Sequence, residues 1–116
     1  MIEVGRIHAW HAHVYYDAAS KPAATVLRDA IAQRWPAARM GRMHDVPVGP
    51  HPLPMFQVLF GVAEFATLAP FIALNRGELV VLVHPESGRP KDDHLKHAMW
   101  LGAVLPLNGD VLPETD

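Results

Sequence analysis

Histidine is the residue type whose number and spacing point to chemistry in this sequence. Eight histidines occur among 116 residues, and a single alanine separates His11 from His13. The surrounding segment RIHAWHAHVYY (residues 6–16) is rich in aromatic and β-branched residues, which predicts a strand. Alternate residues of a strand share a face, so the two imidazoles project the same way with Cα atoms roughly 7 Å apart. One metal ion can be bound by such a pair, although the spacing also occurs in purely structural pairs.

Two further histidines occur where the backbone is restricted. His51 lies in GPHP, and the flanking prolines limit backbone freedom, which suits a pre-positioned ligand; a capped turn is the structural alternative. His84 ends the apolar run ELVVLVH at a strand-to-loop boundary, where binding groups are commonly held by a rigid element. A polar residue that simply ends the strand is the alternative there. We expect His13, His51 and His84 to bind a metal, with His11 as the next candidate.

Two residues near these histidines are candidates for contact with a substrate. Glu86 would complete the arrangement of two histidines and one carboxylate found in non-haem ferrous oxygenases, or it lies in a solvated turn. Tyr15 shares the strand face of His11 and His13, so it could contact an aromatic substrate, and simple packing explains it as well.

The remaining histidines have weaker signals. His44 and His94 could support the ligands or act as acid–base groups, and a structural or surface role is equally compatible with their positions. Of these two, we assign His44 to substrate binding and His94 to proton transfer. We expect His8 and His97 to be solvated.

Composition excludes several classes of protein. With no cysteine, there is no disulfide, thiolate nucleophile or iron–sulfur site, so a metal must be bound by nitrogen and oxygen. The net charge is −2 and the basic residues are scattered, which argues against nucleic-acid binding. The most apolar stretch, residues 55–74, contains Gln57, Glu64 and Pro70 and so does not predict a membrane helix. No secretory signal is recognisable at the N-terminus, and we expect a cytoplasmic protein.

Apolar periodicity and chain breakers predict seven elements and one domain spanning residues 1–116. The helices are expected to begin at the caps Ser20, Thr67 and Asp92 or Asp93. In the last helix, Leu95, Ala98 and Met99 would face inward. The predicted strands are 6–16, 39–45, 55–63 and 78–84, and the predicted helices are 20–35, 67–75 and 92–102.

The order β-α-β-β-α-β followed by a helix predicts an α+β fold of the ferredoxin-like split type. Its antiparallel sheet would have four strands in the order 4-1-3-2, with both main helices on one face. The other face would be open for a ligand or a second subunit. His11, His51 and His84 would meet at one end of that face, with His13 one step further in.

Four blocks, WHAHVYY, VGPHPLPMFQV, LNRGELVVLVHPESG and DDHLKHAMWLG, span most of the chain. In order and spacing they resemble the DOPA 4,5-dioxygenase family of fungal and bacterial enzymes that cleave aromatic rings. The resemblance implies extradiol cleavage of a catechol by ferrous iron and O₂, on a small ferredoxin-like domain that pairs into a homodimer. Ser87 stands where the family often has threonine, and the tryptophan common after Pro70 is missing, departures that concern substrate choice more than metal binding. The family's histidines fall on His11, His13, His51, His84 and His94.

The sequence leads to one hypothesis with two rivals. Fe(II) would be held by His13, His51 and His84, with His11 as a fourth candidate, while His11 or His94 takes a catechol proton. Tyr15, His44 and Glu86 would contact the small aromatic diol. The first rival is a non-catalytic metal-binding or sensing dimer, in which the same histidines bind zinc, nickel or copper. The second is a plain dimerising module whose histidines are scattered over the sheet.

Overall fold

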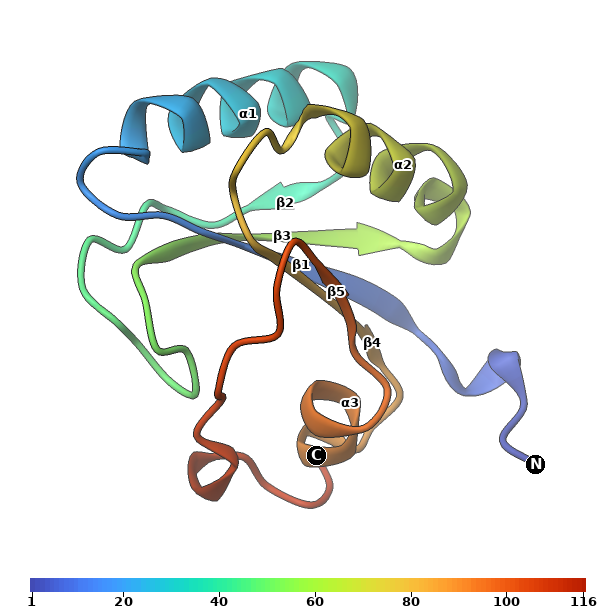
Figure 1. Cartoon of the computed structure of the whole chain (residues 1–116). Coiled ribbons are helices and arrows are strands. Elements are labelled where there is room, and N and C mark those ends of the chain that lie inside the picture. Colours follow the sequence, from blue (N-terminus) through green and yellow to red (C-terminus); the bar gives the residue numbers. More distant parts are fainter.

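The computed structural model covers residues 1–116 and contains one antiparallel sheet with helices on both faces (Figure 1). Neighbouring strands pair antiparallel throughout, in the order β2-β3-β1-β4-β5. The central strand β1 therefore pairs with β3 on one side and β4 on the other. The strands are β1 (Ala9–Tyr15), β2 (Arg39–Met40), β3 (Met55–Gly61), β4 (Val81–Glu86) and β5 (Met99–Leu101).

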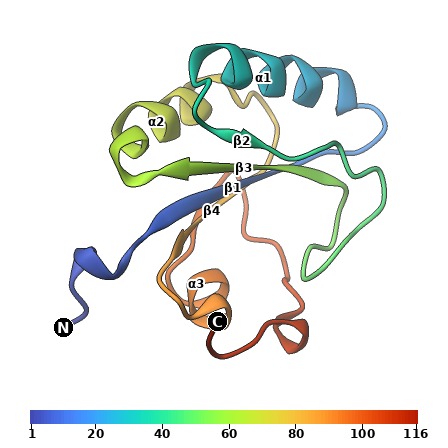
Figure 2. The same cartoon turned by 180° about the vertical axis from the view of Figure 1, so that it is seen from behind.

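Two helices, α1 (Lys21–Arg34) and α2 (Phe65–Asn75), cover one face of the sheet (Figures 1 and 2). The buried residues of α1 are spaced three and four apart, so they form one apolar stripe that packs on the sheet. Alternate residues of β1 and β3 meet this stripe, as the period-two pattern predicts. The main core contains Ala12, Val14, Tyr16, Ala24, Leu27, Ile31, Phe56, Val58, Phe60, Leu68, Ile72, Leu79, Val81 and Val83.

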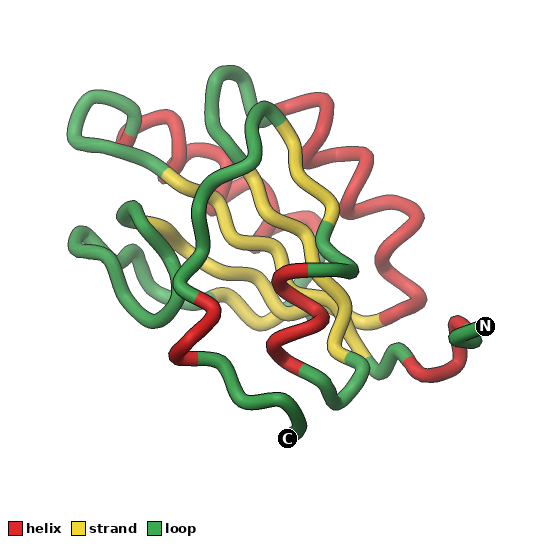
Figure 3. Tube along the Cα trace, turned by 60° about the horizontal axis from the view of Figure 1, so that its bottom comes forward, coloured by secondary structure: helices red, strands yellow, loops and turns green.

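The opposite face is also covered. Helix α3 (Pro90–Leu95), the short turn η3 (Gly109–Val111) and the C-terminal segment cross it (Figure 3). A second, smaller core forms beneath them from Tyr15, Met55 and Leu82, with Trp100, Leu105 and Leu107 among the residues packed against it. The prediction that this face is open is therefore wrong, because α3 and the segment after β5 fold back across it.

The prediction of an α+β fold is confirmed, and the prediction of a four-stranded sheet is wrong. The first four strands lie in the order 4-1-3-2, but β5 extends the sheet beyond β4 by pairing Met99–Leu101 with Val81–Val83. The ferredoxin-like description therefore does not match in full. The segment predicted to be the last helix divides into α3 and β5, since the helix ends at Leu95. Leu95 and Met99 are 48% and 42% exposed rather than inward-facing.

Smaller boundary errors follow from local pairing. Of the strand predicted at 39–45, only Arg39–Met40 forms a strand, and an isolated bridge joins His44 to Met55. Helix α2 begins at Phe65 rather than after Thr67, because a 3₁₀ turn, η2 (Val62–Glu64), runs directly into it. In contrast, the expected bounds of α1 are close to the observed ones.

The His51 loop is tied to both neighbouring segments. Asp45 accepts hydrogen bonds from the Tyr16 hydroxyl and from Lys21, both at 2.9 Å. On the other side, the Asn108 backbone N–H donates to the Pro50 carbonyl at 2.9 Å. These contacts hold an irregular, proline-rich loop at the edge of the sheet without regular secondary structure.

No helix in the structure is both long and apolar enough to cross a membrane. The cytoplasmic location, the single domain and the homodimer stay predictions.

Stability should depend on the main core. Phe56 is fully buried between the sheet and the helices, and we expect Phe56→Ala to lower the free energy of unfolding by about 3–5 kcal/mol through lost burial and a residual cavity. Leu74→Ala is the matched control, because Leu74 is 84% exposed and its truncation should change stability by less than about 0.5 kcal/mol. Urea unfolding of the metal-free protein measures both values. Equal effects of the two substitutions would contradict this assignment of the core.

Candidate metal centre

The register between β1 and β4 builds the first half of a histidine cluster. His11 lies directly opposite His84 in the antiparallel ladder, and His13 follows on the same face of β1. The ring centroids of His11 and His84 are 5.1 Å apart, and those of His11 and His13 are 5.7 Å apart. The closest approach is between Nε2 of His13 and Nε2 of His84, at 3.1 Å. Two nitrogens bound to one ion at about 2.1 Å and nearly at right angles would lie about 3 Å apart.

Two histidines from outside the sheet complete the cluster. His51 comes from the proline-rich loop, and its ring centroid lies 4.1 Å from that of His13. His94 comes from α3, and its centroid lies 3.8 Å from that of His84. The rings of His51 and His94 are 6.3 Å apart. Segments from β1, the loop before β3, β4 and α3 therefore meet at one point beneath the C-terminal covering.

The five histidines fall into two groups that could each hold a metal ion. One group is His11, His13 and His84, and the other is His13, His51 and His94; within each, the ligand atoms lie within 4.8 Å of one another. His13 belongs to both. The four predicted ligands all lie in the cluster, but the predicted combination of His13, His51 and His84 is neither group. Which of them bind a metal stays a prediction.

Backbone carbonyls orient two of the rings. Nδ1–H of His84 donates to the Pro85 carbonyl at 3.0 Å, and Nδ1–H of His94 donates to the Pro90 carbonyl at 2.7 Å. A carbonyl can only accept, so each Nδ1 carries the proton and each Nε2 keeps its lone pair. This is the tautomer in which metal-binding histidines are commonly held.

Side chains orient two more rings. Nδ1–H of His11 donates to Oε1 of Glu86 at 2.5 Å, which makes Glu86 a partner of His11. The Tyr15 hydroxyl lies 2.7 Å from Nδ1 of His51 and forms a hydrogen bond with it. His13 differs from the other four, because its Nδ1 is buried and has no hydrogen-bond partner. An unpaired buried nitrogen is costly, so the Nδ1 of His13 sets this ring apart from a histidine that serves only the core, while the atom of His13 that faces His84 is Nε2.

Burial keeps four rings of the cluster, those of His13, His51, His84 and His94, uncharged. His13, His51 and His84 are 3%, 7% and 0% exposed. Burial, reinforced by the neighbouring imidazoles, holds the pKa of His13 well below its ordinary value. Burial and the charge of His94 lower the pKa of His51 to about 4. Burial lowers the pKa of His84 and of His94 as well, although a backbone hydrogen bond opposes the effect in each. At neutral pH these four rings are neutral, so their lone pairs are available to a metal.

The other predicted site residues lie around the cluster. Burial by itself raises the pKa of the Glu86 carboxyl. The hydrogen bond and charge of His11 outweigh this effect and hold the pKa below its usual range, so Glu86 is ionised. Tyr15 is 2% exposed, and burial raises its pKa well above the ordinary value. His44 is half-buried and belongs to neither group of ligands, and its Nδ1 also lacks a partner. Their roles in substrate binding stay predictions.

Sequence reasoning missed the contacts of Asp93 and His97. Asp93, considered only as a helix cap, is 1% exposed and binds Ser87. His97, which we expected to be a solvated side chain without a structural role, is half-buried, and its Nδ1 lies 3.1 Å from Oδ1 of Asp93. The spacing of four residues between Asp93 and His97 on a helical turn could have indicated their contact.

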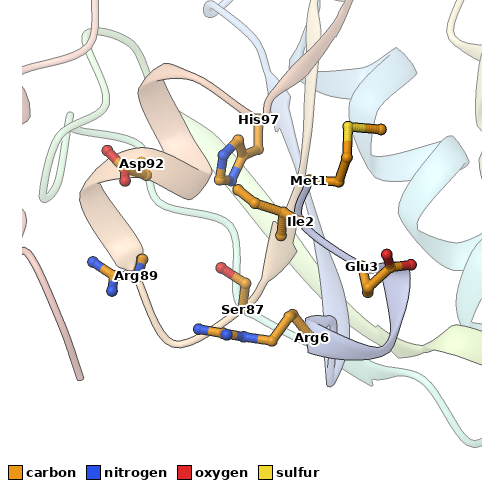
Figure 4. Close-up of a pocket in the computed structure, with 8 residues that line it drawn as sticks. All are labelled: Met1, Ile2, Glu3, Arg6, Ser87, Arg89, Asp92 and His97. Carbon is orange, nitrogen blue, oxygen red and sulfur yellow. The ribbon is translucent and has the colours of Figure 1, made fainter.

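The largest cavity lies beside the cluster rather than at it. It has a volume of about 450 Å³, and none of the five clustered histidines lines it. Ser87, Arg89 and His97 lie on one side of it, and the N-terminal segment that carries Arg6 lies on the other (Figure 4). We give the histidine cluster more weight than this cavity, because the cluster carries the convergent nitrogen ligands. Its half-buried members, His11 and His94, are the rings nearest to solvent.

Fold and site together define an α+β protein with buried histidine groups that could hold a metal ion. The chain belongs to the Dopa 4,5-dioxygenase family, which matches it over residues 10–111. All five clustered histidines fall within that range. The resemblance seen in the four sequence blocks is thereby confirmed.

Individual relatives agree with this assignment. The chain is 34% identical over 115 residues to a protein of Amanita muscaria named DOPA 4,5-dioxygenase, covering 92% of this chain and 50% of that protein. It is 37% identical over 111 residues to an uncharacterized 21.2 kDa protein of Botryotinia fuckeliana, covering 86% and 61% respectively. The chain thus spans 50% and 61% of the length of these curated relatives.

A solved structure matches over almost its full length. The crystal structure of "a putative dioxygenase" from Nostoc punctiforme PCC 73102 has a TM-score of 0.93 and 41% sequence identity, and the match covers 96% of each chain. The five-stranded sheet therefore occurs in a protein of similar sequence, together with its covering helices.

The neutral imidazoles predict a pH-dependent stability. Unfolded histidines titrate near 6.5, whereas His13, His51 and His84 stay neutral to lower pH in the folded, metal-free protein. Below about pH 6.5 the unfolded chain binds more protons, so the free energy of unfolding should fall as the pH falls, by at most about 1.4 kcal/mol per pH unit for each imidazole. Urea unfolding between pH 7.5 and 5 measures this slope.

Two variants test whether the pH dependence of the free energy of unfolding comes from the clustered histidines. His84→Gln removes a buried imidazole and should flatten the dependence on pH. His8→Gln changes an exposed histidine outside the cluster and should leave it unchanged. A free energy of unfolding that is constant from pH 7 to pH 5 in the unsubstituted protein would show that the rings are not neutral by burial.

Proposed function

We propose that this chain is an extradiol dioxygenase that opens the ring of a catechol, such as a DOPA-like diol, with O₂ at a ferrous ion held by histidines. The observation that carries the proposal is the convergence of five imidazoles, four of them with Nδ1 anchored by hydrogen bonds. Membership of the family supports the type of reaction. The name of the Amanita muscaria relative supports the substrate class.

His11, His13 and His84 are the ligands that the geometry favours. The separation of 3.1 Å between Nε2 of His13 and Nε2 of His84 fits two adjacent ligands of one ion. His11 is held by Glu86, and a carboxylate behind a metal-binding histidine is a common arrangement that orients the ring and raises its basicity. Three histidines on two rigid strands leave the remaining coordination positions to other ligands. When bound, ferrous iron would supply binding positions for the diol and for O₂ and a path for electrons between them.

His94 is then free for proton transfer. Its Nδ1–H donates to the Pro90 carbonyl, so Nε2 can accept a proton from a diol hydroxyl that approaches beside His84. Its lowered pKa keeps it unprotonated, and therefore competent as a base, at neutral pH. Loss of that proton lets the diol bind as an anion. The burial of His13, His51 and His84, which are 3%, 7% and 0% exposed, limits the access of water to the reacting ring.

The second function to consider is a non-catalytic metal-binding domain on the same fold. It is favoured by the burial of the cluster, since three of its rings are less than 10% exposed and none of them lines the cavity of about 450 Å³. In that case the second group, His13, His51 and His94, could contribute ligands as well, and zinc, nickel or copper would be bound without an open position.

Ring cleavage is tested directly. Metal-free protein is loaded with Fe(II) under anaerobic conditions and then given catechol or DOPA and air. We expect a yellow muconic semialdehyde with one O₂ consumed per diol, because both oxygen atoms enter the product. Zinc-loaded protein is the control and should form no product. The absence of product from a panel of catechols, with iron shown to be bound, would reject the dioxygenase in favour of the metal-binding domain.

Single substitutions separate the roles of the histidines. His84→Ala and His11→Ala should each weaken Fe(II) or Co(II) affinity by more than about 100-fold, because each removes a proposed ligand. His94→Ala should keep most of the metal affinity and lose kcat by about 10²–10⁴-fold. Metal competition titrations and initial rates measure the two quantities, and His8→Ala is the matched exposed control. Strong metal binding by His84→Ala together with loss of binding in His94→Ala would assign the metal to the second group instead.

A further inference from the structure

A buried carboxylate that neither histidine group uses lies between two segments of the cluster. Asp93 is 1% exposed, and both of its oxygens are satisfied. Oδ2 accepts from the Ser87 backbone N–H at 2.8 Å, and Oδ1 accepts from the Ser87 hydroxyl at 2.6 Å. Oδ1 also accepts from Nδ1–H of His97 at 3.1 Å. Burying a carboxylate costs a large hydration free energy unless hydrogen bonds replace the lost water. The three hydrogen bonds to Asp93 are therefore costly to break, and they restrain the groups that donate them.

These hydrogen bonds join α3 to the end of β4. Ser87 follows Glu86, the last residue of β4, while Asp93 lies within α3 directly before His94. Only Gly88 and Arg89 connect Ser87 to the helix, and Gly88 has a φ of 88°, a conformation open mainly to glycine. The turn itself is therefore a weak restraint on the angle of α3. Ser87 and His97 both face the cavity beside the turn (Figure 4), so close packing does not replace the link on that side.

The restraint acts on the contact between His84 and His94. His84 is carried by β4 and His94 by α3, and their ring centroids are 3.8 Å apart. Because His94 is the residue after Asp93, a small rotation of α3 about the Ser87 link would move its ring away from His84. A shift of about 1 Å in a group that moves a proton can lower the rate by about 100-fold.

The geometry points to Asp93 as a positioning residue that fixes His94 against His84 by tying α3 to Ser87 at the end of β4. The consequence for catalysis rests on the proposed function, in which His94 takes the proton of the diol. The positioning itself does not rest on it, since it concerns the arrangement of the chain's own rings.

The positioning is tested by NMR on the metal-free protein. Nuclear Overhauser cross-peaks between the ring protons of His84 and His94 should be present in the unsubstituted protein and lost or strongly weakened in Asp93→Ala. The cross-peaks between His13 and His51, whose rings are 4.1 Å apart and lie outside both linked segments, serve as the internal reference and should persist. Asp92→Asn is the matched control on the same helix, because Asp92 is 28% exposed and pairs only with Lys96 at 3.4 Å. It should leave all cross-peaks unchanged.

Two milder substitutions keep the test decisive if Asp93→Ala does not fold. Ser87→Ala removes only the hydroxyl donor and should weaken the same cross-peaks, whereas Ser87→Thr keeps the hydroxyl and should restore them. In the iron-loaded protein, Ser87→Ala should lower kcat by about 10-fold to 100-fold with little change in KM. Unchanged contacts between His84 and His94 in both Asp93→Ala and Ser87→Ala, or in Ser87→Ala alone where Asp93→Ala is unfolded, would overturn the inference. If the unsubstituted, iron-loaded protein opens no catechol while the variants lose the contacts between His84 and His94, the proposed function is rejected and the positioning role is retained.

Discussion

The antiparallel register between β1 and β4 is the constraint on which the site depends. It places His11 opposite His84 and puts His13 one pleat further along, so that three imidazoles from two strands share one face. A slip of one residue in either strand would turn its histidines toward the helices and its valines toward the cluster. The register is therefore protected by the apolar residues on the other face, above all Ala12 and Val14, which are fully buried. The main core and the candidate metal centre therefore lie on opposite faces of the same pair of strands, β1 and β4.

Burial of several imidazoles at one point lowers the stability of the fold and leaves their nitrogens ready to bind a ligand. Each buried ring loses hydration, and protonated neighbours would repel one another, so burial and mutual repulsion keep the rings neutral. Hydrogen bonds to Nδ1 offset part of the loss, and two of them use the carbonyls of Pro85 and Pro90. Pro85 is the second-last residue of β4 and Pro90 is the first residue of α3, so each carbonyl belongs to the element that carries the histidine bound to it. The same bonds hold Nε2 of each ring toward the cluster, so one set of contacts both stabilises the fold and prepares the ligands.

Sequence patterns predicted the parts of this arrangement that depend on periodicity. The alternation along residues 9–15 separated His11, His13 and Tyr15 from the core face. The cap at Ser20 and the proline at position 36 predicted the bounds of α1. The segment DHLKHAMWLG was misread as one helix, because β5 has only three residues and exists through pairing with β4. Because of that error, the sequence-based prediction left the face that carries the histidines open. The contact between Asp93 and Ser87 was also beyond reach, since it depends on the angle at which α3 meets the end of β4.

The five histidines differ in the elements that carry them, and this difference matches the division of roles in the proposed function. His11, His13 and His84 lie on paired strands, where the ladder fixes each Cα and leaves only ring rotation free. His51 and His94 lie on a loop and a six-residue helix, which are held by side-chain and tail contacts. Ligands benefit from rigidity, whereas an acid–base group must stay close to a substrate while that substrate enters and leaves. In the proposed function, the ring of His94 must therefore be held close to His84 by contacts outside the sheet, and the buried carboxylate of Asp93 beside it has the position and the hydrogen bonds to do so.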